Sequence, residues 1–339
     1  MTTTPLCATA LDDARRLTEA PMRAALDRLD PDTRRVCGYH LGLWDADGGP
    51  GGGTGKGIRP ALALLSARAA GASPSRGVPA AVACELVHNF SLLHDDVMDG
   101  DEQRHHRPTA WTHFGTSAAI LAGDALLSLA NEVLAETSSP TVPWAVRCVN
   151  ATTRRLIAGQ AADLAFETRD DVTVDECLQM ASDKTGALLA CAASLGAVIV
   201  DAPARVALGL ADYGNHLGMA FQLVDDLLGI WGSSERTGKP VWSDLRARKK
   251  SLPVVAALQA GGPATDRLRA LYALDRPLED AELAEAAGLV EETGGRAWAE
   301  AAAERESSQA VAVLTDLALP GRVQDELGAL TSMLSERDH

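Results

Sequence analysis

Apolar segments of helical length, separated by short stretches rich in glycine and proline, run through most of this sequence. Helical periodicity begins near Leu11, stops at the glycine-rich stretch 48–57 and resumes after Pro60. Aromatic residues make up only 4% of the chain, and no alternating run is long enough to build a sheet. The pattern therefore predicts an all-α helical bundle. Further breaks between helices are expected at 71–79, 138–143, 168–172, 201–203, 232–240 and 261–263.

Composition limits the classes of function that the chain can have. Its 339 residues show no compositional shift and no fixed repeat, so we expect a single domain spanning residues 1–339. The net charge of −15 argues against nucleic acid as a partner, because phosphate binding needs clustered Lys and Arg. The N-terminus lacks a secretory pattern, and the longest apolar run, 186–200, is shorter than the ~20 residues of a spanning helix. We expect a cytoplasmic protein without an integral membrane segment.

Two familiar kinds of site are not indicated. The six cysteines stand far apart without a CxxC pair, so neither a zinc site nor a disulfide framework is expected. The stretch GGGTGKG looks like a nucleotide-binding P-loop, but Pro50 stands where the first glycine is required and Gly57 where Ser or Thr is required. We therefore reject a P-loop and treat residues 48–57 as a connecting loop.

Residues 79–99, treated as one helix, carry an acidic stripe opposite an apolar one. In a helical projection His88, Asp95, Asp96 and Asp99 fall within about 100° of one another. Such a stripe usually marks a solvated face. Three aspartates this close repel one another unless a cation lies between them, which favours a metal site.

A second acidic pair, Asp225 and Asp226, shares one helical face with Gln222 and Gly229. Carboxylates at these spacings suit Mg²⁺, which keeps waters and recruits substrate phosphates to complete its octahedron. Basic residues flank both acidic pairs. Each of them alone is best explained as a surface charge, but as a set they indicate groups that bind a diphosphate. They are Lys56, Arg59, Arg104, Arg107, Lys184, Lys239, Lys249 and Lys250.

Together these motifs resemble the trans-isoprenyl diphosphate synthases of the polyprenyl synthetase family, and geranylgeranyl diphosphate synthases in particular. The resemblance covers Gly55 to Pro253 and includes, in family order, GKGIRP, ELVHNFSLLHDDVMDGD, RPT, DKTGALL, GMAFQLVDD and TGKPVWSDLRARKKSLP. It implies an isoprenoid-synthase-type bundle with a central cavity between the two Asp motifs, usually in a homodimer. It also implies a prenyltransferase that condenses isopentenyl diphosphate with an allylic prenyl diphosphate.

The resemblance assigns a role to each motif residue. Magnesium ions on the aspartates would grip the allylic diphosphate, and nearby cations would stabilise the departing pyrophosphate as the allylic C–O bond breaks. The implied metal ligands are Asp95, Asp96, Asp99, Asp225 and Asp226. The implied helpers at the allylic diphosphate are Arg104, Lys184, Thr185, Gln222, Lys239 and Lys249. Isopentenyl diphosphate would be held by Lys56, Arg59 and His88.

Phe90, five residues before Asp95, stands where this family commonly places the floor of the product tunnel. Ordinary core packing explains a phenylalanine there about as well. As a floor, Phe90 would limit the product to a short chain, and we expect twenty carbons.

Three positions depart from the family pattern. His105 stands where an arginine that binds isopentenyl diphosphate is expected, and imidazole is a weaker, non-bidentate phosphate ligand. Gly229 stands where the second motif usually ends in Asp, and Trp242 replaces a small residue. These changes leave open a terpene cyclase-like enzyme on the same fold, which ionises a prenyl diphosphate without elongating it. A non-catalytic regulatory subunit of a synthase is a weaker alternative, because both Asp pairs are present.

Overall fold

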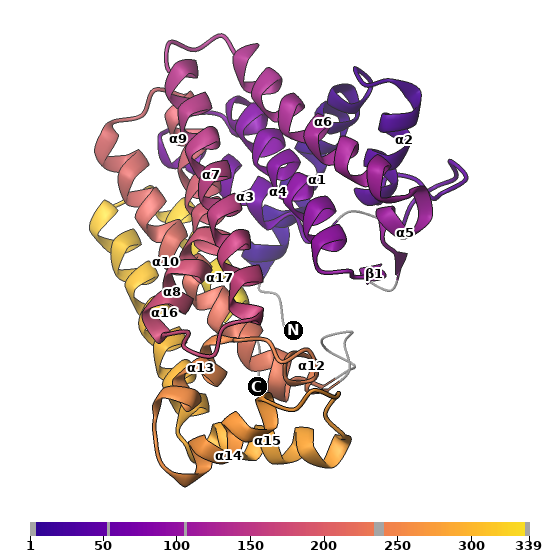
Figure 1. Ribbon diagram of the computed structural model, residues 1–339. Helices are drawn as coiled ribbons and strands as arrows, with labels where there is room; N and C mark the ends of the chain where they lie inside the picture. Colours follow the sequence, from indigo (N-terminus) through magenta and orange to yellow (C-terminus); the bar gives the residue numbers. More distant parts are fainter. Residues whose placement is uncertain (1–4, 53–54, 105–106, 234–240, 336–339) are drawn as a thin grey trace.

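The computed structural model describes residues 5–52, 55–104, 107–233 and 241–335, and helices make up most of them (Figure 1). In the described part of the chain, the sheet is a hairpin of two-residue antiparallel strands, β1 (Gln103–Arg104) and β2 (Arg107–Pro108). The prediction of an all-α fold is confirmed. The helices are α1 (Pro5–Leu26), α2 (Pro31–His40), α3 (Ile58–Ala69), η1 (Pro74–Gly77), α4 (Val78–Met98), α5 (Ala110–Phe114), α6 (Thr116–Ala135), α7 (Val142–Glu167), α8 (Val174–Ala181), η2 (Ser182–Gly186), α9 (Ala187–Ile199), α10 (Ala204–Trp231), α12 (Ser243–Arg246), α13 (Leu252–Gln259), α14 (Pro263–Tyr272), α15 (Asp280–Glu292), α16 (Gly295–Leu317) and α17 (Gly321–Ser335).

Helix α10 links three clusters of buried apolar side chains. Its first half contributes Leu210 and Leu217 to the main core, which α1, α3, α4, α6 and α9 share. Leu223 belongs to a second cluster with α8, α13 and α16, and Ile230 to a third with α14 and α15. Burial of such side chains is the main favourable term in folding. One long helix therefore ties the upper bundle of Figure 1 to the small layer of α13, α14 and α15 below it.

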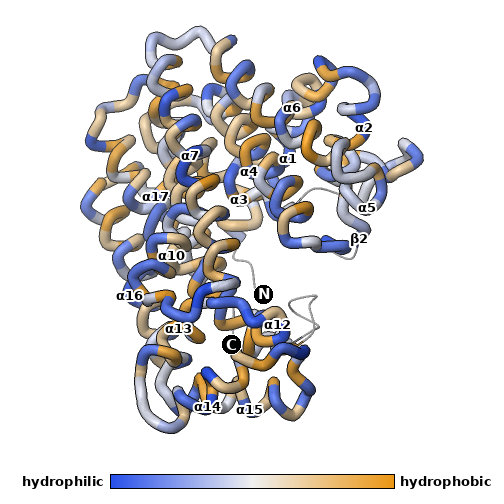
Figure 2. The backbone as a smooth tube through the Cα atoms, viewed as in Figure 1, coloured by the Kyte–Doolittle hydropathy of each residue, from blue (hydrophilic) through white to orange (hydrophobic). Residues whose placement is uncertain are grey.

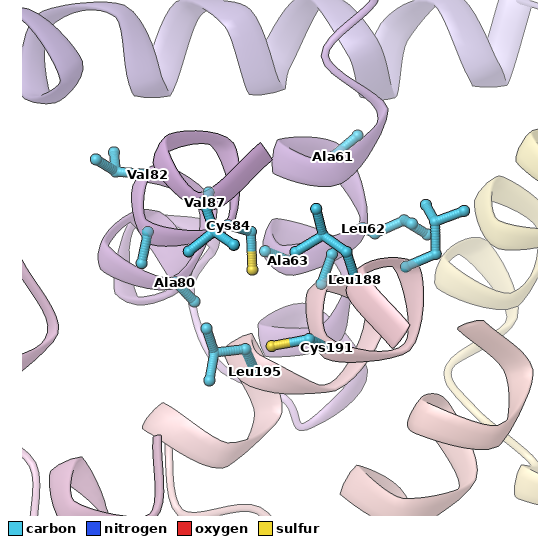
Figure 3. Close-up of a cluster of buried hydrophobic side chains, with 14 of the residues drawn as sticks. Ala61, Leu62, Ala63, Ala80, Val82, Cys84, Val87, Leu188, Cys191 and Leu195 are labelled. Atoms are coloured by element: carbon cyan, nitrogen blue, oxygen red, sulfur yellow. The ribbon is translucent and has the colours of Figure 1, made fainter. Parts of the chain in front are cut away.

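The main core is tightly packed where α3, α4 and α9 meet. Cys84 on α4 and Cys191 on α9 point toward each other there, among leucine, valine and alanine side chains (Figure 3). A hydrogen bond between the two thiols raises the pKa of Cys84 and lowers that of Cys191. All six cysteines are free thiols, as expected from their spacing.

The apolar run 186–200 is a core element, because α9 is buried along almost its whole length. Helix α6 is the one helix in the described ranges that is long and apolar enough to cross a membrane by length and composition alone, and 39% of that segment is buried in the protein. Its outer side exposes Ile120 and Leu121. An apolar helix that is covered on one side only is also what a subunit interface requires.

Most helix boundaries follow the breaks that the sequence predicts. Helices end at Ala135, Glu167, Ile199, Trp231 and Gln259, each just before a predicted break. The N-terminal part differs from the expectation. The first helix begins at Pro5 rather than near Leu11, and a new helix starts at Pro31, where the Asp30 side chain accepts hydrogen bonds from the backbone N–H groups of residues 32 and 33.

Candidate active site

The first Asp motif lies at the carboxyl end of α4, where hydrophilic residues lead into the hairpin (Figure 2). Asp95 is half-buried and Asp99 is exposed, whereas the Asp96 side chain is 2% exposed. Burial raises the pKa of the Asp95 carboxyl to about 6, even though the charge of Lys184 opposes the shift and that of Asp99 adds to it. Asp95 and Asp99 therefore form a partly buried pair of like charges, which a cation would stabilise.

Asp96 is buried and holds the hairpin. Its Oδ1 accepts a hydrogen bond from Nε of Arg104 on β1 at 2.7 Å, while Oδ2 has no hydrogen-bond partner among the described residues. The hydroxyl of Thr109 and the indole N–H of Trp111 both donate to the carbonyl of Asp101, each at 2.8 Å. These bonds fix the orientation of Arg104 beside the carboxyl end of α4.

Helix α7 brings two polar side chains to the same region. Gln160 donates to Asp99 at 3.1 Å, and Asp163, one turn further along, accepts from Nζ of Lys184 at 2.5 Å. Lys184 lies in η2, a π-helical turn, and the side of α7 facing it carries Gly159. A Cβ on Gly159 would lie 2.5 Å from the backbone nitrogen of Lys184, so the close approach of the two elements requires glycine.

The second Asp motif is connected to η2 by a chain of hydrogen bonds. Thr185 donates to Gln222 at 2.6 Å, and Gln222 donates to Asp226 at 2.7 Å. The other oxygen of Asp226 accepts from the backbone N–H of Leu252 at 2.9 Å. Asp226 is 5% exposed, and this burial raises its pKa to about 7. Asp226 thus joins α10 to η2 and α13, while Asp225 beside it is exposed.

Lys249 provides positive charge beside the second motif. Burial alone would lower its pKa, but the carboxylates of Asp244, Asp163, Asp226 and Asp225 raise it above the usual range. Asp163 also interacts electrostatically with Asp99. The charges of both Asp motifs therefore meet around Asp163, Lys184 and Lys249.

The segment after the second Asp motif comes back into contact with α10 where α12 begins. Ser243 donates to the carbonyl of Gly229 at 3.3 Å, and the carboxylate of Asp244 fills the space where a side chain on residue 229 would begin. Trp242, just before α12, has a left-handed backbone with φ of 60° and packs against the third core cluster. That conformation favours glycine, which agrees with the small residue expected at this position.

Residues expected at the isopentenyl diphosphate lie along α3 and α4. Arg59 is in the first turn of α3, where burial lowers its pKa and the Glu85 carboxylate raises it. Its Nε has no hydrogen-bond partner among the described residues. His88 is half-buried one turn after Glu85, and Lys56 is exposed just before α3.

Phe90 lies on α4 between the Asp motif and the core. It is 7% exposed and contacts His94 edge to face, with ring centroids 4.9 Å apart. The imidazole of His94 in turn meets the carbonyl of Ile120 at 3.0 Å, against Gly123 of α6. Phe90 is therefore held by a contact between α4 and α6.

Two of the predicted residues, His105 and Lys239, lie outside the described residues. Sequence reasoning missed Gln160 and Asp163, which join Lys184 and Asp99 in the site. Their signal was a Gly-Gln-x-x-Asp stretch, in which Gln160 and Asp163 stand at a helical spacing of three. Sequence reasoning also gave no site role to Asp244, which lies nineteen positions after Asp225 in the sequence.

Comparison with known proteins identifies the family of the chain. The Polyprenyl synthetase family description matches residues 52–290. The chain is 51% identical over 328 residues to a (2E,6E)-farnesyl diphosphate synthase of Mycobacterium tuberculosis, covering 96% of this chain and 91% of the relative. It is similar to a crystal structure of a polyprenyl synthetase from Streptomyces coelicolor, with a TM-score of 0.92, 52% identity and coverage of 97% and 99%. A geranylgeranyl pyrophosphate synthase from Corynebacterium glutamicum, complexed with isoprenyl diphosphate and magnesium, has a TM-score of 0.80 at 26% identity and coverage of 99% and 100%. The chain belongs to the polyprenyl synthetase family and is a prenyltransferase.

Proposed function

We propose that this prenyltransferase is Mg²⁺-dependent and condenses isopentenyl diphosphate with an allylic prenyl diphosphate to give a short all-trans product. The observation that carries the proposal is the meeting of two carboxylate-bearing helix ends, on α4 and α10, around Asp163, Lys184 and Lys249. Neighbouring carboxylates and ammonium groups suit a metal-bound diphosphate, because the carboxylates can bind the metal and the ammonium groups can bind the diphosphate oxygens.

The exposed carboxylates fit magnesium better than the buried ones do. Asp99 and Asp225 are exposed and Asp95 is half-buried, whereas Asp96 and Asp226 are buried and accept hydrogen bonds from Arg104, Gln222 and the backbone of residue 252. In the described part of the chain no three His, Cys, Asp or Glu side chains form a ready metal cluster. This suits an ion that completes its octahedron with water and diphosphate oxygens. We therefore assign Asp95, Asp99 and Asp225 as ligands and Asp96 and Asp226 as positioning residues.

The chain's own residues would carry the reaction as follows. Lys184 and Arg104, oriented by Asp163 and Asp96, donate to the allylic diphosphate while its C1–O bond breaks and the bonding electrons leave with pyrophosphate. Magnesium, when bound by Asp95, Asp99 and Asp225, would supply further positive charge to the departing pyrophosphate. The double bond of isopentenyl diphosphate attacks C1, and a proton leaves the resulting cation for the bound pyrophosphate. Apolar side chains around Phe90 exclude water that would quench the cation.

The isopentenyl diphosphate would lie beside Lys56, Arg59 and His88. The buried Nε of Arg59, which has no hydrogen-bond partner among the described residues, is a donor suited to a diphosphate oxygen. A cyclase has no use for this second anion site, so the retained residues favour elongation. The names of these three relatives favour it as well, since each is a synthase or synthetase.

The length of the product is set, in this proposal, by Phe90. The twenty-carbon product expected from the sequence matches the name of the Corynebacterium protein, whereas the more similar Mycobacterium relative is named for the fifteen-carbon product. We propose that Phe90 closes the tunnel at no more than twenty carbons.

We further propose that the protein is cytoplasmic and works as a homodimer. Helices α6 and α7 pack together and expose Leu121, Trp144 and Ile157, which are 62%, 61% and 55% exposed. A second copy of this chain would cover these exposed apolar side chains on the surface of α6 and α7.

Incubation of the purified protein with Mg²⁺ and geranyl or farnesyl diphosphate, with and without isopentenyl diphosphate, tests the proposed function. Longer prenols that form only with isopentenyl diphosphate are the expected result, and their length reports the product. Hydrocarbons or cyclic alcohols formed without it would replace the proposal with the cyclase. Activity that appears only with an added synthase subunit would identify a regulatory chain.

A further inference from the structure

The hairpin that carries Arg104 is too short to be stable by itself. Each of its strands, β1 and β2, has two residues, and even longer isolated hairpins are only marginally stable in water. Hydrogen bonds from Thr109 and Trp111 to the carbonyl of Asp101 close its base. They do not reach the strands themselves, where Arg104 donates to Asp96. The strands therefore need support from another element.

Tyr39 of α2 provides that support. Its hydroxyl donates to the carbonyl of Pro108 on β2 at 2.7 Å. The guanidinium of Arg107, also on β2, lies over the Tyr39 ring with its Cζ 4.6 Å from the ring centroid, and it donates to the Tyr39 carbonyl at 3.3 Å. A hydrogen bond and a cation–π contact thus act on neighbouring residues, so one side chain fixes both residues of β2.

Tyr39 is itself held in place by the helical bundle. It is 6% exposed, and α2 packs against α5 and α6 (Figure 1). Its ring stacks on His113 with 5.6 Å between centroids and contacts Phe114 edge to face at 5.2 Å. Such aromatic contacts fix the orientation of a ring. The bundle therefore positions the hairpin through Tyr39.

We propose that Tyr39 is a positioning residue for prenyl transfer, which holds β2 and thereby keeps Arg104 directed at the allylic diphosphate. Arg104 lies opposite Arg107 in the register of the hairpin. Movement of Arg107 away from the Tyr39 ring would therefore draw Arg104 away from Asp96. Tyr39 precedes residue 52, where the family match begins, and is part of none of the motifs that resemble the family. The inference rests on the proposed function for the role of Arg104.

Hydrogen exchange measured by mass spectrometry tests the support of the hairpin without any ligand. The backbone N–H of Thr109 donates to the carbonyl of Glu102 at 3.0 Å and so reports whether the hairpin is closed. Tyr39→Phe removes the hydrogen bond to Pro108 but keeps the ring beside Arg107, whereas Tyr39→Leu removes both contacts. Peptides that contain Thr109 should exchange about fivefold faster in Tyr39→Phe and about tenfold or more faster in Tyr39→Leu.

Calorimetric binding of pyrophosphate in the presence of Mg²⁺ tests the effect on Arg104. Tyr39→Phe should weaken this binding by about threefold, because Arg104 is then less often in place to donate. In the Arg104→Ala background the same change should have no further effect, since no guanidinium is left to position. Tyr213→Phe is the matched control, because the Tyr213 hydroxyl also donates to a backbone carbonyl, that of Leu327 at 3.0 Å, but between α10 and α17. It should lower the melting temperature to a similar degree and leave pyrophosphate affinity unchanged.

Unchanged exchange at Thr109 or unchanged pyrophosphate affinity in Tyr39→Phe would overturn the inference. An effect of Tyr39→Phe that is equally large with and without Arg104→Ala would do the same, because Tyr39 would then act by another route. Melting without ligand shows whether Tyr39→Leu folds, and Tyr39→Phe remains as the test if it does not. Failure of the unaltered protein to bind pyrophosphate with Mg²⁺ would instead reject the proposed function. The exchange experiment needs no substrate, so its result stands whether or not condensation is observed.

Discussion

Single residues of the two Asp motifs have different tasks, although a helical projection groups them on one face. In each motif the second aspartate is buried and bound to protein, and the aspartate before it is more accessible: Asp95 is half-buried and Asp225 is exposed. The partners come from later in the chain: Arg104 is eight residues after Asp96, and Leu252 is twenty-six residues after Asp226. Helical periodicity carries no information about partners in other elements. The division into exposed and buried aspartates therefore could not be predicted from the sequence.

The first prediction separates Asp95 from Asp96. Asp95→Asn removes a proposed ligand and should raise the Mg²⁺ concentration for half-maximal activity by about tenfold or more. Asp96→Asn can still accept from Arg104, so it should lower turnover while leaving that Mg²⁺ concentration nearly unchanged. Initial rates across a Mg²⁺ titration measure both quantities. Equal shifts in the Mg²⁺ requirement for the two variants would contradict the division.

The second prediction concerns Asp226 and pH. Its pKa is about 7 in the fold against 3.8 for the free side chain, so the native state binds more protons than the unfolded state between these values. Ionisation of Asp226 therefore lowers the free energy of unfolding as pH rises from about 4 to 7. Asp226→Asn is neutral throughout, and the amide of Gln222 can turn over to pair with it. The variant should gain stability relative to the original protein as pH rises through this window. Urea denaturation of both proteins at pH 5 and pH 8, without metal, measures the difference; a constant difference would refute the assignment.

The third prediction concerns Phe90. Phe90→Ala should lower stability by about 3 kcal/mol, because it opens a cavity beside His94, and should lengthen the longest prenol formed. Phe166→Ala is the matched control, since Phe166 is equally buried but belongs to the second core cluster. It should cost similar stability and leave the product unchanged. An identical product profile in all three proteins would mean that Phe90 is only a core residue.

At the scale of elements, the sequence predicts long helices well and short connections poorly. Apolar periodicity and Gly or Pro breaks located α4, α7, α9 and α10 to within a few residues, but they gave only the end of α6, because its start at Thr116 follows no predicted break. The hairpin β1–β2 has two residues in each strand, too few to show a strand period. The π turn η2 lies inside a continuous helical pattern, so nothing local marks it. These two unpredicted elements orient Arg104 and Lys184, which is why the site's charges could be identified but not arranged.

The fourth prediction tests the contact between α7 and η2. Replacing a helical glycine by alanine usually stabilises by ~1 kcal/mol, and Gly328→Ala should do so because its added methyl meets nothing within 4 Å. Gly159→Ala would place a methyl against the backbone of Lys184, so it should destabilise instead and raise the KM for the allylic substrate. Thermal melts and steady-state kinetics of both variants measure these effects. Stabilisation of both variants to the same degree would show that α7 and η2 separate easily.

The whole molecule combines a strongly acidic charge with exposed apolar side chains on the surface of α6 and α7. Two copies, each with a net charge of −15, repel one another, and salt screens this repulsion over about 10 Å at 0.1 M. Burial of the exposed leucine, isoleucine and tryptophan of α6 and α7 favours association and is not weakened by salt. A homodimer through this face should therefore become tighter as salt is added, the opposite of an interface held by ion pairs.

The fifth prediction follows from that balance. Leu121→Glu combined with Ile157→Glu adds charge to the apolar face, and sedimentation velocity should show the double variant as a monomer where the unaltered protein is a dimer. Leu208→Glu on α10, at a leucine that is 70% exposed, is the control and should remain dimeric. If the Leu208→Glu variant is a monomer as well, the interface includes α10. If α6 and α7 form the interface, a second copy of the chain covers α6, the helix that is apolar enough for a membrane. Added salt should then partly restore the dimer of the Leu121→Glu, Ile157→Glu variant, because it screens the new charges.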